Sequence, residues 1–355
     1  GAYTLFPQHN PEKRMGLEEI ISLEGHNDRV WGVEWRPQGD LLASCSGDRT
    51  VRIWAQQAGQ RGWGCTAVLE DFATKAVRSM SWSPCGSKLA TASFDGKSSV
   101  WRLCEGQWEL VATVEGHENE VKANAWSPSG TMLATCSRDK SVWVWEVDPE
   151  RNEFECIDVM QKHTQDVKHV TWHPSWEYPL LVSCSYDNSI ILWTDNGTCD
   201  DWHNVQTLGK ESGGHTSTVW QLSVHPDGSR MASCGDDCSV KVWSCGRASD
   251  GRQPNWAHVC TLSGYHERAV YSCHYSAGGL IASGSGDNSI RIFAEDAEAE
   301  AEPGSRARPF RQLACREAAH ASDVNCVRWN PTRTGMLASA GDDEVVKIWQ
   351  LRADP

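Results

Sequence analysis

The chain has 355 residues, of which 39% are hydrophobic and 19 are tryptophan, which is enough apolar material for a large buried core. Its formal net charge of −14 argues against wholesale nucleic-acid binding, because that function requires a broad basic surface. The sequence has no long apolar run and no apolar signal segment, so we expect a soluble intracellular protein.

The first predicted strands follow an N-terminal tail, residues 1–16. Leu17–Leu23 (LEEIISL) has the character of a β-strand. The runs VWGVEW, LLASCS and VRIW come next as short β-branched or apolar stretches, separated by the turn formers PQGD and GDR. A fourth and more variable segment completes such a unit, as FECIDVM does after Trp145. The sequence therefore predicts units of four short strands.

This unit recurs along the whole chain. Seven copies end in an aromatic residue at intervals of 44 to 56 residues: Trp54, Trp101, Trp145, Trp193, Trp243, Phe293 and Trp349. Each copy has an aspartate six positions earlier, namely Asp48, Asp95, Asp139, Asp187, Asp237, Asp287 and Asp343. Each also has a serine or threonine ten positions earlier, namely Ser44, Thr91, Thr135, Ser183, Ser233, Ser283 and Ser339. Six copies have an upstream histidine, namely His26, His117, His163, His215, His266 and His320, where the second copy has Ala73.

Four predicted strands per copy, a Gly-His pair and a terminal tryptophan resemble the WD40-repeat family across essentially the whole chain. The resemblance implies an all-β protein, a seven-bladed β-propeller with residues 17–355 as a single domain. The seventh copy ends after three strands, near Leu351. We therefore expect Leu17–Leu23 to complete the last blade and to remove a free sheet edge.

The repeated polar residues have a structural role in that family, where His, Ser or Thr, Asp and Trp form a hydrogen-bonded set inside each blade. The resemblance assigns this blade network to His26, Asp48, His117, Asp139, His163, Asp187, His215, Asp237, His266, Asp287, His320 and Asp343. Such sets resemble Ser-His-Asp catalytic triads. A catalytic site would not be repeated around a ring, so we expect buried partners that satisfy one another rather than an enzyme. The set of the second blade lacks its histidine, and we expect that blade to be held less firmly.

Two connecting segments are longer than the rest. Ser244–Asn255 is rich in glycine and polar residues, and we expect an excursion before the outer strand of the fifth blade. The segment 294–311 has an acidic half followed by three arginines, and we expect a flexible surface loop. A docking or regulatory loop is the alternative for that segment.

The 15 cysteines are odd in number and contain no C-x-x-C pair, which favours free thiols over a disulfide framework. Cys45, Cys136, Cys184 and Cys234 occupy one repeated position, where cysteine serves as a small buried residue. Cys234 and Cys238 lie on either side of one turn, so we expect no bound metal and no cofactor. Transient ligation by Cys199 or Cys245 stays open as an alternative.

Three positions per blade point to one face of a WD40 propeller, the top face. The first position holds Arg29, Ala76, Glu120, Asp166, Thr218, Ala269 and Asp323. The second holds Trp31, Arg78, Lys122, Lys168, Trp220, Tyr271 and Asn325. The third holds Gly47, Phe94, Arg138, Tyr186, Asp236, Gly286 and Asp342.

Aromatic and cationic residues dominate the predicted partner-binding set of the top face: Arg138, Arg78, Lys122, Lys168, Phe94, Tyr186, Trp31, Trp220 and Tyr271. The four cations fall on blades two to four, whereas Asp236, Asp323 and Asp342 lie on later blades. Arg138 is the only arginine that precedes a repeat aspartate, and we expect it to contact a partner. The alternative is a surface arginine paired with Glu120 or Asp166.

Several stretches go beyond the general repeat, including EGHENEVKANAWSPSGTMLATCSRDKSVWVWEVD (Glu115–Asp148), KHTQDVKHVTWHPS and DVNCVRWNP. These are similar to the WD40 component of the cytosolic iron–sulfur protein assembly (CIA) machinery. The resemblance implies a non-enzymatic scaffold of the CIA targeting complex, located in the cytoplasm, with the nucleus as a second location. It also implies two partners, a small cysteine-bearing assembly factor and a HEAT-repeat adaptor, together with apo iron–sulfur client proteins. Arg138 matches an exposed top-face arginine of that family.

A different class of WD40 protein stays open, either a substrate receptor of a ubiquitin ligase or a reader of histone peptides. Ligase receptors usually carry W-D-x-R at the end of the third strand. The residues after the repeat aromatics here are Ala55, Arg102, Glu146, Thr194, Ser244, Ala294 and Gln350. None of them is aspartate, which disfavours the ligase receptor.

Overall fold

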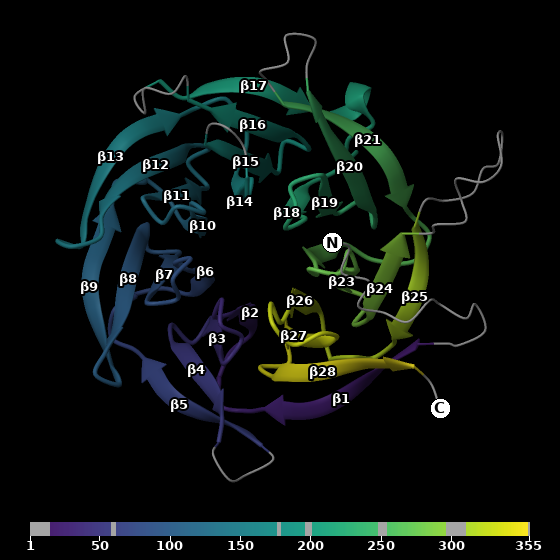
Figure 1. Ribbon diagram of the computed structural model, residues 1–355, viewed down its shortest axis with the longest axis horizontal. Coiled ribbons are helices and arrows are strands. Elements are labelled where there is room, and N and C mark those ends of the chain that lie inside the picture. The colour runs from purple at the N-terminus through teal and green to yellow at the C-terminus, as the bar shows by residue number, and fades with distance from the viewer. Residues whose placement is uncertain are drawn as a thin grey trace, which may run out of the picture.

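The computed structural model describes residues 15–57, 62–175, 179–195, 201–247, 254–295 and 310–353. It confirms an all-β, seven-bladed propeller in which the blades follow one another around a central axis (Figure 1). Each blade is a four-stranded antiparallel sheet, with its first strand at the axis and its fourth at the circumference.

The blades are named in chain order, from one to seven. Blades one and two consist of β2 (Val30–Trp35), β3 (Leu41–Ser46), β4 (Val51–Gln56), β5 (Trp63–Leu69), β6 (Val77–Trp82), β7 (Lys88–Ser93), β8 (Lys97–Cys104) and β9 (Gln107–Glu115). Blades three and four consist of β10 (Val121–Trp126), β11 (Met132–Ser137), β12 (Val142–Asp148), β13 (Glu153–Met160), β14 (Val167–Trp172), β15 (Leu180–Ser185), β16 (Ile190–Thr194) and β17 (His203–Leu208). Blades five and six consist of β18 (Val219–Val224), β19 (Arg230–Gly235), β20 (Val240–Arg247), β21 (Pro254–Leu262), β22 (Val270–Tyr275), β23 (Ile281–Ser285), β24 (Ile290–Glu295) and β25 (Phe310–Arg316). Blade seven consists of β26 (Val324–Trp329), β27 (Met336–Gly341), β28 (Val346–Ala353) and the N-terminal β1 (Met15–Leu23).

The ring is closed by the N-terminal strand, as the sequence predicts. β1 pairs antiparallel with β28, so that Leu17 lies opposite Leu351 and Leu23 lies opposite Val346. The strand begins at Met15, two residues before the predicted boundary of the tail. Because both ends of the chain share one sheet, opening the ring requires this pairing to break.

Burial falls from the second strand of each blade to the fourth. All six residues of β11 are buried, because neighbouring blades cover both faces of that strand. The outer strand β13 alternates between half-buried and exposed side chains and buries only its last residue, Met160. Cysteine fits the crowded second strands because it is small, and Cys45, Cys136, Cys184 and Cys234 are all buried.

The two long connections lie largely outside the described residues. Of the segment Ser244–Asn255, residues 248–253 are not described, and the ends belong to β20 and β21. Of the segment 294–311, residues 296–309 are not described, and the ends belong to β24 and β25. The predictions of a mobile excursion and a flexible loop fall on these residues. In the described part of the chain the one helical turn is η1 (Lys210–Ser212), and no helix is long and apolar enough to cross a membrane.

Candidate functional site

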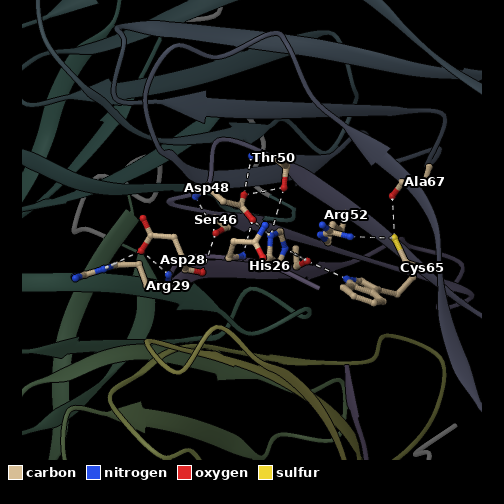
Figure 2. A network of polar contacts seen from close by, with 12 residues as sticks. His26, Asp28, Arg29, Ser46, Asp48, Thr50, Arg52, Cys65 and Ala67 are labelled. Carbon is tan, nitrogen blue, oxygen red and sulfur yellow. Dashed lines mark hydrogen bonds and ion pairs between the residues drawn. The ribbon is translucent and has the colours of Figure 1, made fainter. Parts of the chain in front are cut away.

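The repeated polar residues form a hydrogen-bonded network inside blade one (Figure 2). His26 Nδ1 lies 2.8 Å from the Asp48 carboxylate, and His26 Nε2 lies 2.7 Å from Ser44 Oγ. The indole Nε1–H of Trp54 donates to the same Ser44 Oγ at 2.9 Å. Asp48 also accepts the backbone N–H groups of Asn27 and Thr50, at 3.1 and 2.9 Å. One carboxylate thereby fixes the turn between β3 and β4 to the loop that carries the histidine.

The same arrangement recurs in blades three, four, five and seven. There the histidine Nδ1 lies 2.8–2.9 Å from the aspartate, and Nε2 lies 2.7–2.8 Å from the serine or threonine hydroxyl. The tryptophan Nε1–H donates to that hydroxyl at 2.8–3.0 Å. Blade six keeps the His266–Asp287 and His266–Ser283 contacts, but Phe293 has no N–H to donate.

These networks hold ionised carboxylates. Burial raises the pKa of Asp139, but hydrogen bonds from His117 and Ser141 outweigh that effect and lower the pKa to about 2. In the other blades burial also raises the pKa of the repeat aspartate, but the hydrogen bond from the histidine outweighs this effect. The pKa values therefore lie well below their usual range for Asp48, Asp187, Asp237 and Asp287.

The geometry of these sets does not suit triad chemistry. The histidine side chains are at most 3% exposed, and both ring nitrogens of each have a partner within the blade. Each hydroxyl is bonded to its histidine and, in five blades, to an indole as well. A nucleophile needs an approach path for a substrate carbonyl, and these hydroxyls lie in second strands buried on both faces.

Blade two departs from the pattern where Ala73 replaces the histidine. The Thr91 hydroxyl turns to the backbone oxygen of Ser99 at 3.2 Å, and the buried Trp101 Nε1 has no hydrogen-bond partner among the described residues. Phe72 packs edge-on against Trp101 with ring centroids 5.3 Å apart. Asp95 keeps its turn, because it still accepts the Thr74 and Lys97 N–H groups at 2.8 and 3.2 Å.

The second top-face position of each blade is a β-bulge. In every first strand the register shifts across this residue, as between Val121 and Ala123 around Lys122. The seven unpaired residues are Trp31, Arg78, Lys122, Lys168, Trp220, Tyr271 and Asn325. A bulge residue makes no ladder pair, so its side chain can vary without cost to the sheet.

The third top-face position is fixed in every blade by a backbone hydrogen bond. In every blade its N–H donates to the carbonyl of the first-position residue, and for Arg138 this bond to Glu120 is 3.0 Å long. The equivalent bonds of Gly47, Phe94, Tyr186, Asp236, Gly286 and Asp342 span 2.9–3.0 Å. The side chain takes no part in the blade network. Arg138 and Tyr186 project outward into solvent. The side chain of Arg138 is 56% exposed, and the whole residue Tyr186 is 54% exposed.

The cations of the top face are less available than the sequence predicts. Lys122 Nζ lies 2.5 Å from Glu120 and 4.3 Å from the Phe94 ring centre. Lys168 Nζ lies 3.3 Å from Asp166 and sits over the Trp220 ring at 5.0 Å. Arg138 shares Glu120 at 3.4 Å, which is the ion pair weighed as the alternative, and it keeps most of its surface in solvent.

Later blades bind their acids internally. Trp220 Nε1–H donates to Asp236 at 2.5 Å, and its ring meets Tyr271 edge-on at 5.4 Å. Asn325 donates to Asp342 at 2.7 Å. The aromatic side chains Trp31, Phe94, Tyr186, Trp220 and Tyr271 thus lie among the charged residues of the ring. Cation–aromatic contacts link blade one to two, blade two to three and blade four to five.

Arg268 and Arg328 lie in this region but outside the three predicted top-face positions of each blade. Arg268 has a side chain 57% exposed on the top face, where it pairs with Asp323 at 3.0 Å. It lies one residue before the first position, so the three-position rule omits it. Arg328 lies on β26 in the axial channel, where Nε donates to Glu34 at 2.7 Å. Its inward-facing position on a first strand would have indicated it.

In the described part of the chain no group of three or more His, Cys, Asp or Glu side chains is placed to hold a metal ion. Cys234 is buried, Cys238 and Cys245 are half-buried, and Cys199 lies outside the described residues.

Seven radial blades, a repeated His-Asp-Ser-Trp network and a variable top face define a WD40-repeat propeller. The chain belongs to this family: the description "WD domain, G-beta repeat" matches residues 17–55, 63–102, 108–146, 154–194, 204–244, 256–293 and 312–350. Among curated proteins the chain is 49% identical to the "Probable cytosolic iron-sulfur protein assembly protein CIAO1 homolog" of Chlamydomonas reinhardtii, over 95% of this chain and 99% of the relative. It is 48% identical to "Protein CIA1" of Arabidopsis thaliana, over 97% and 99% of the two chains. It is 45% identical to "Probable cytosolic iron-sulfur protein assembly protein Ciao1" of Culex quinquefasciatus, over 95% and 99%.

Proposed function

We propose that this chain is a non-enzymatic scaffold of the cytosolic iron–sulfur protein assembly machinery. The names of relatives at 45–49% identity, each covered over almost its full length, support this role. The internal satisfaction of the blade networks supports a scaffold rather than an enzyme, because their hydroxyls and imidazoles are committed to holding the blades together. The protein works in the cytoplasm, and also in the nucleus where its clients are nuclear.

The scaffold acts through protein contacts. Its partners are a small cysteine-bearing assembly factor and a HEAT-repeat adaptor, and the propeller itself is a monomer within that complex. The complex helps deliver 4Fe–4S clusters, as cargo, to apo-proteins that bind to it. Residues 17–355 form the one domain that makes these contacts.

The observation that carries the proposal is the Arg138 position on the top face. Its backbone is fixed by the bond to Glu120, while its side chain is 56% exposed and stands outside the blade network. Arginine offers a forked set of donors that can hold a carboxylate with two hydrogen bonds. Exposed Tyr186 stands on the next blade, so a client tail that ends in an aromatic residue and a free carboxylate would meet both a stacking surface and a counter-charge.

The test is a paired measurement on Arg138→Glu. We expect an unchanged unfolding temperature, and a loss of affinity for a client tail peptide of about 2 kcal/mol or more if the contact is desolvated. Arg151→Glu is the matched control, since Arg151 lies on the outer hairpin of the same blade with a side chain 73% exposed. Affinity purification of the intact chain with mass spectrometry identifies the protein partners. Unchanged binding of every partner and of the tail by Arg138→Glu would place the interface elsewhere.

A further inference from the structure

Several cationic side chains line the mouth of the axial channel, and the contacts on the top face leave some of their N–H donors unpaired. Arg78 on β6, Lys122 on β10 and Lys168 on β14 are the bulge residues of three consecutive blades, whose first strands stand side by side around the axis (Figure 1). Together with Arg328 and His169 they line one cavity at the mouth of the channel. Glu34 is the one carboxylate among the residues that line this cavity.

The one lining carboxylate is already committed. Glu34 accepts a hydrogen bond from Arg328 Nε at 2.7 Å, and Arg328 Nη1 donates to Gln221 and to the Val327 carbonyl at 3.2 and 3.0 Å. Arg328 and Glu34 therefore neutralise each other across the seam between blades seven and one. The remaining cations of the mouth have no acid within the channel.

Arg78 is the least compensated of these cations. Its guanidinium lies 5.0 Å from the ring centre of Trp31, and among the described residues no hydrogen bond or ion pair reaches it. Burial lowers the pKa of Arg78, and no carboxylate contributes a countering effect. A guanidinium has five N–H donors, and Arg78 is half-buried, so its charge is only partly hydrated and lacks an acid partner.

Lys122 and Lys168 hold donors in reserve. Each ammonium has three N–H donors and donates one hydrogen bond to the acid two residues earlier, which is Glu120 for Lys122 and Asp166 for Lys168. Burial lowers the pKa of Lys168, and the charges of Lys122 and Arg78 add to that effect. Beside them His169 Nδ1 is buried without a hydrogen-bond partner among the described residues. Arg78, Lys122 and Lys168 thus bring unused N–H donors to one place of positive potential.

We propose that the mouth of the axial channel binds a small free oxyanion of the phosphate class, held by Arg78, Lys122 and Lys168. Tetrahedral oxyanions carry acceptor oxygens on every side, which suits donors that converge from three blades. A cation would be repelled, and an apolar group would leave the Arg78 donors unpaired. The aromatic wall of Trp31, Trp220 and Tyr271 shields the site and strengthens the attraction.

The effect of this anion site on docking rests on the proposed function, because it assumes that partners dock at Arg138. The bound anion would neutralise cations beside the Arg138 contact, so it would weaken the docking of an acidic or carboxylate-bearing partner. The free oxyanion then acts as an antagonist of docking, with a position separate from Arg138 itself.

The experiment measures binding of inorganic phosphate to the intact chain by phosphorus NMR and by thermal unfolding, against sodium chloride at equal ionic strength. We expect phosphate to raise the unfolding temperature and chloride to have little effect. Arg78→Met should weaken phosphate binding at least about tenfold, the loss expected for a charge-assisted contact. Lys168→Met provides a second variant with the same expectation. Arg138→Met, on the exposed rim, is the control and should keep the parent affinity.

Several outcomes would overturn the proposal. Equal stabilisation by phosphate and chloride would mean charge screening only. Loss of phosphate binding in Arg138→Met but not in Arg78→Met and Lys168→Met would move the site to the rim. The other source of an anion is the terminal carboxylate of a client tail, which is tested by comparing the binding of the free-acid tail with that of its amidated form. If binding of the free-acid tail depends on Arg78 and phosphate does not bind, the mouth of the channel is a site for a polypeptide carboxylate. Partner binding measured without phosphate tests the proposed function by itself, so either idea can fail alone.

Discussion

Replacing Asp139 by alanine isolates what one blade network contributes to stability. Asp139 accepts hydrogen bonds from His117 Nδ1 at 2.8 Å, from the Glu118 N–H at 3.1 Å and from the Ser141 N–H at 3.0 Å, and it also accepts the Ser141 hydroxyl. The variant leaves a buried imidazole and two backbone donors without their acceptor. Part of that cost is relieved by water at the turn, so we expect a loss of about 1–3 kcal/mol in the free energy of unfolding.

Asp95→Ala is the matched control, because blade two has the same turn without the histidine. Asp95 accepts the Thr74 and Lys97 N–H groups, and no imidazole depends on it. We expect that variant to lose about half as much or less. For a chain of this size a loss of 1 kcal/mol lowers the unfolding temperature by roughly 1–2 °C, so both variants need chemical denaturation as well as calorimetry. Equal losses in the two variants would refute the argument that the histidine couples the aspartate to the blade.

Three further predictions follow from the same contacts. Ala73→His should stabilise the chain by about 1 kcal/mol, because it can join Asp95 to Thr91 and turn the Thr91 hydroxyl towards Trp101; a loss of stability in denaturant would show that Phe72 leaves no room for it. Leu23→Ala should cost about 2–4 kcal/mol in unfolding free energy, because Leu23 is 4% exposed in the closing strand, while Ile20→Ala on the same strand, 42% exposed, should be near neutral. Burial, with the charges of Arg328 and Arg78, lowers the pKa of His169 to about 3, whereas the imidazole of the unfolded chain titrates at about 6.5. The stability that comes from keeping His169 neutral is therefore fully present above the unfolded pKa and is lost as the pH falls towards 3. His169→Asn should flatten the fall in unfolding temperature between neutral and mildly acidic pH.

The repeat made the fold predictable from the sequence, because each of its signals recurs with fixed spacing. The aspartate six residues before Trp145 and the threonine ten residues before it lie where the blade requires them, at the turn and on the second strand. The closing strand was predictable for a different reason. A seventh copy with three strands leaves one edge unpaired, and Leu17–Leu23 is the one spare strand-like segment.

The state of each top-face cation was not predictable in the same way. Position rules treat Lys122 and Glu120 as separate sites on the face, but the bulge after Val121 brings their side chains to 2.5 Å. Whether a cation is captured or free depends on side-chain reach across the ring, and neighbouring blades come from distant parts of the sequence. The isolation of Arg78 required the same information, since it depends on which acids of the surrounding blades reach its guanidinium.

Arg138 and Asp139 are adjacent in the sequence, yet the fold gives them separable roles. The Asp139 side chain points into the blade and holds its turn, whereas Arg138 is held through its N–H bond to Glu120 and lends its side chain to the face. A backbone bond does not depend on the identity of the side chain, so Arg138 can change without loss of the turn, and Asp139 cannot. Effects on stability and on binding should therefore divide between these two residues: Asp139→Ala lowers the unfolding temperature and leaves partner affinity intact below it, while Arg138→Glu does the reverse. Because the third position of every blade is fixed through its backbone N–H, its side chain can change to suit a partner on a scaffold that the neighbouring residues keep in place.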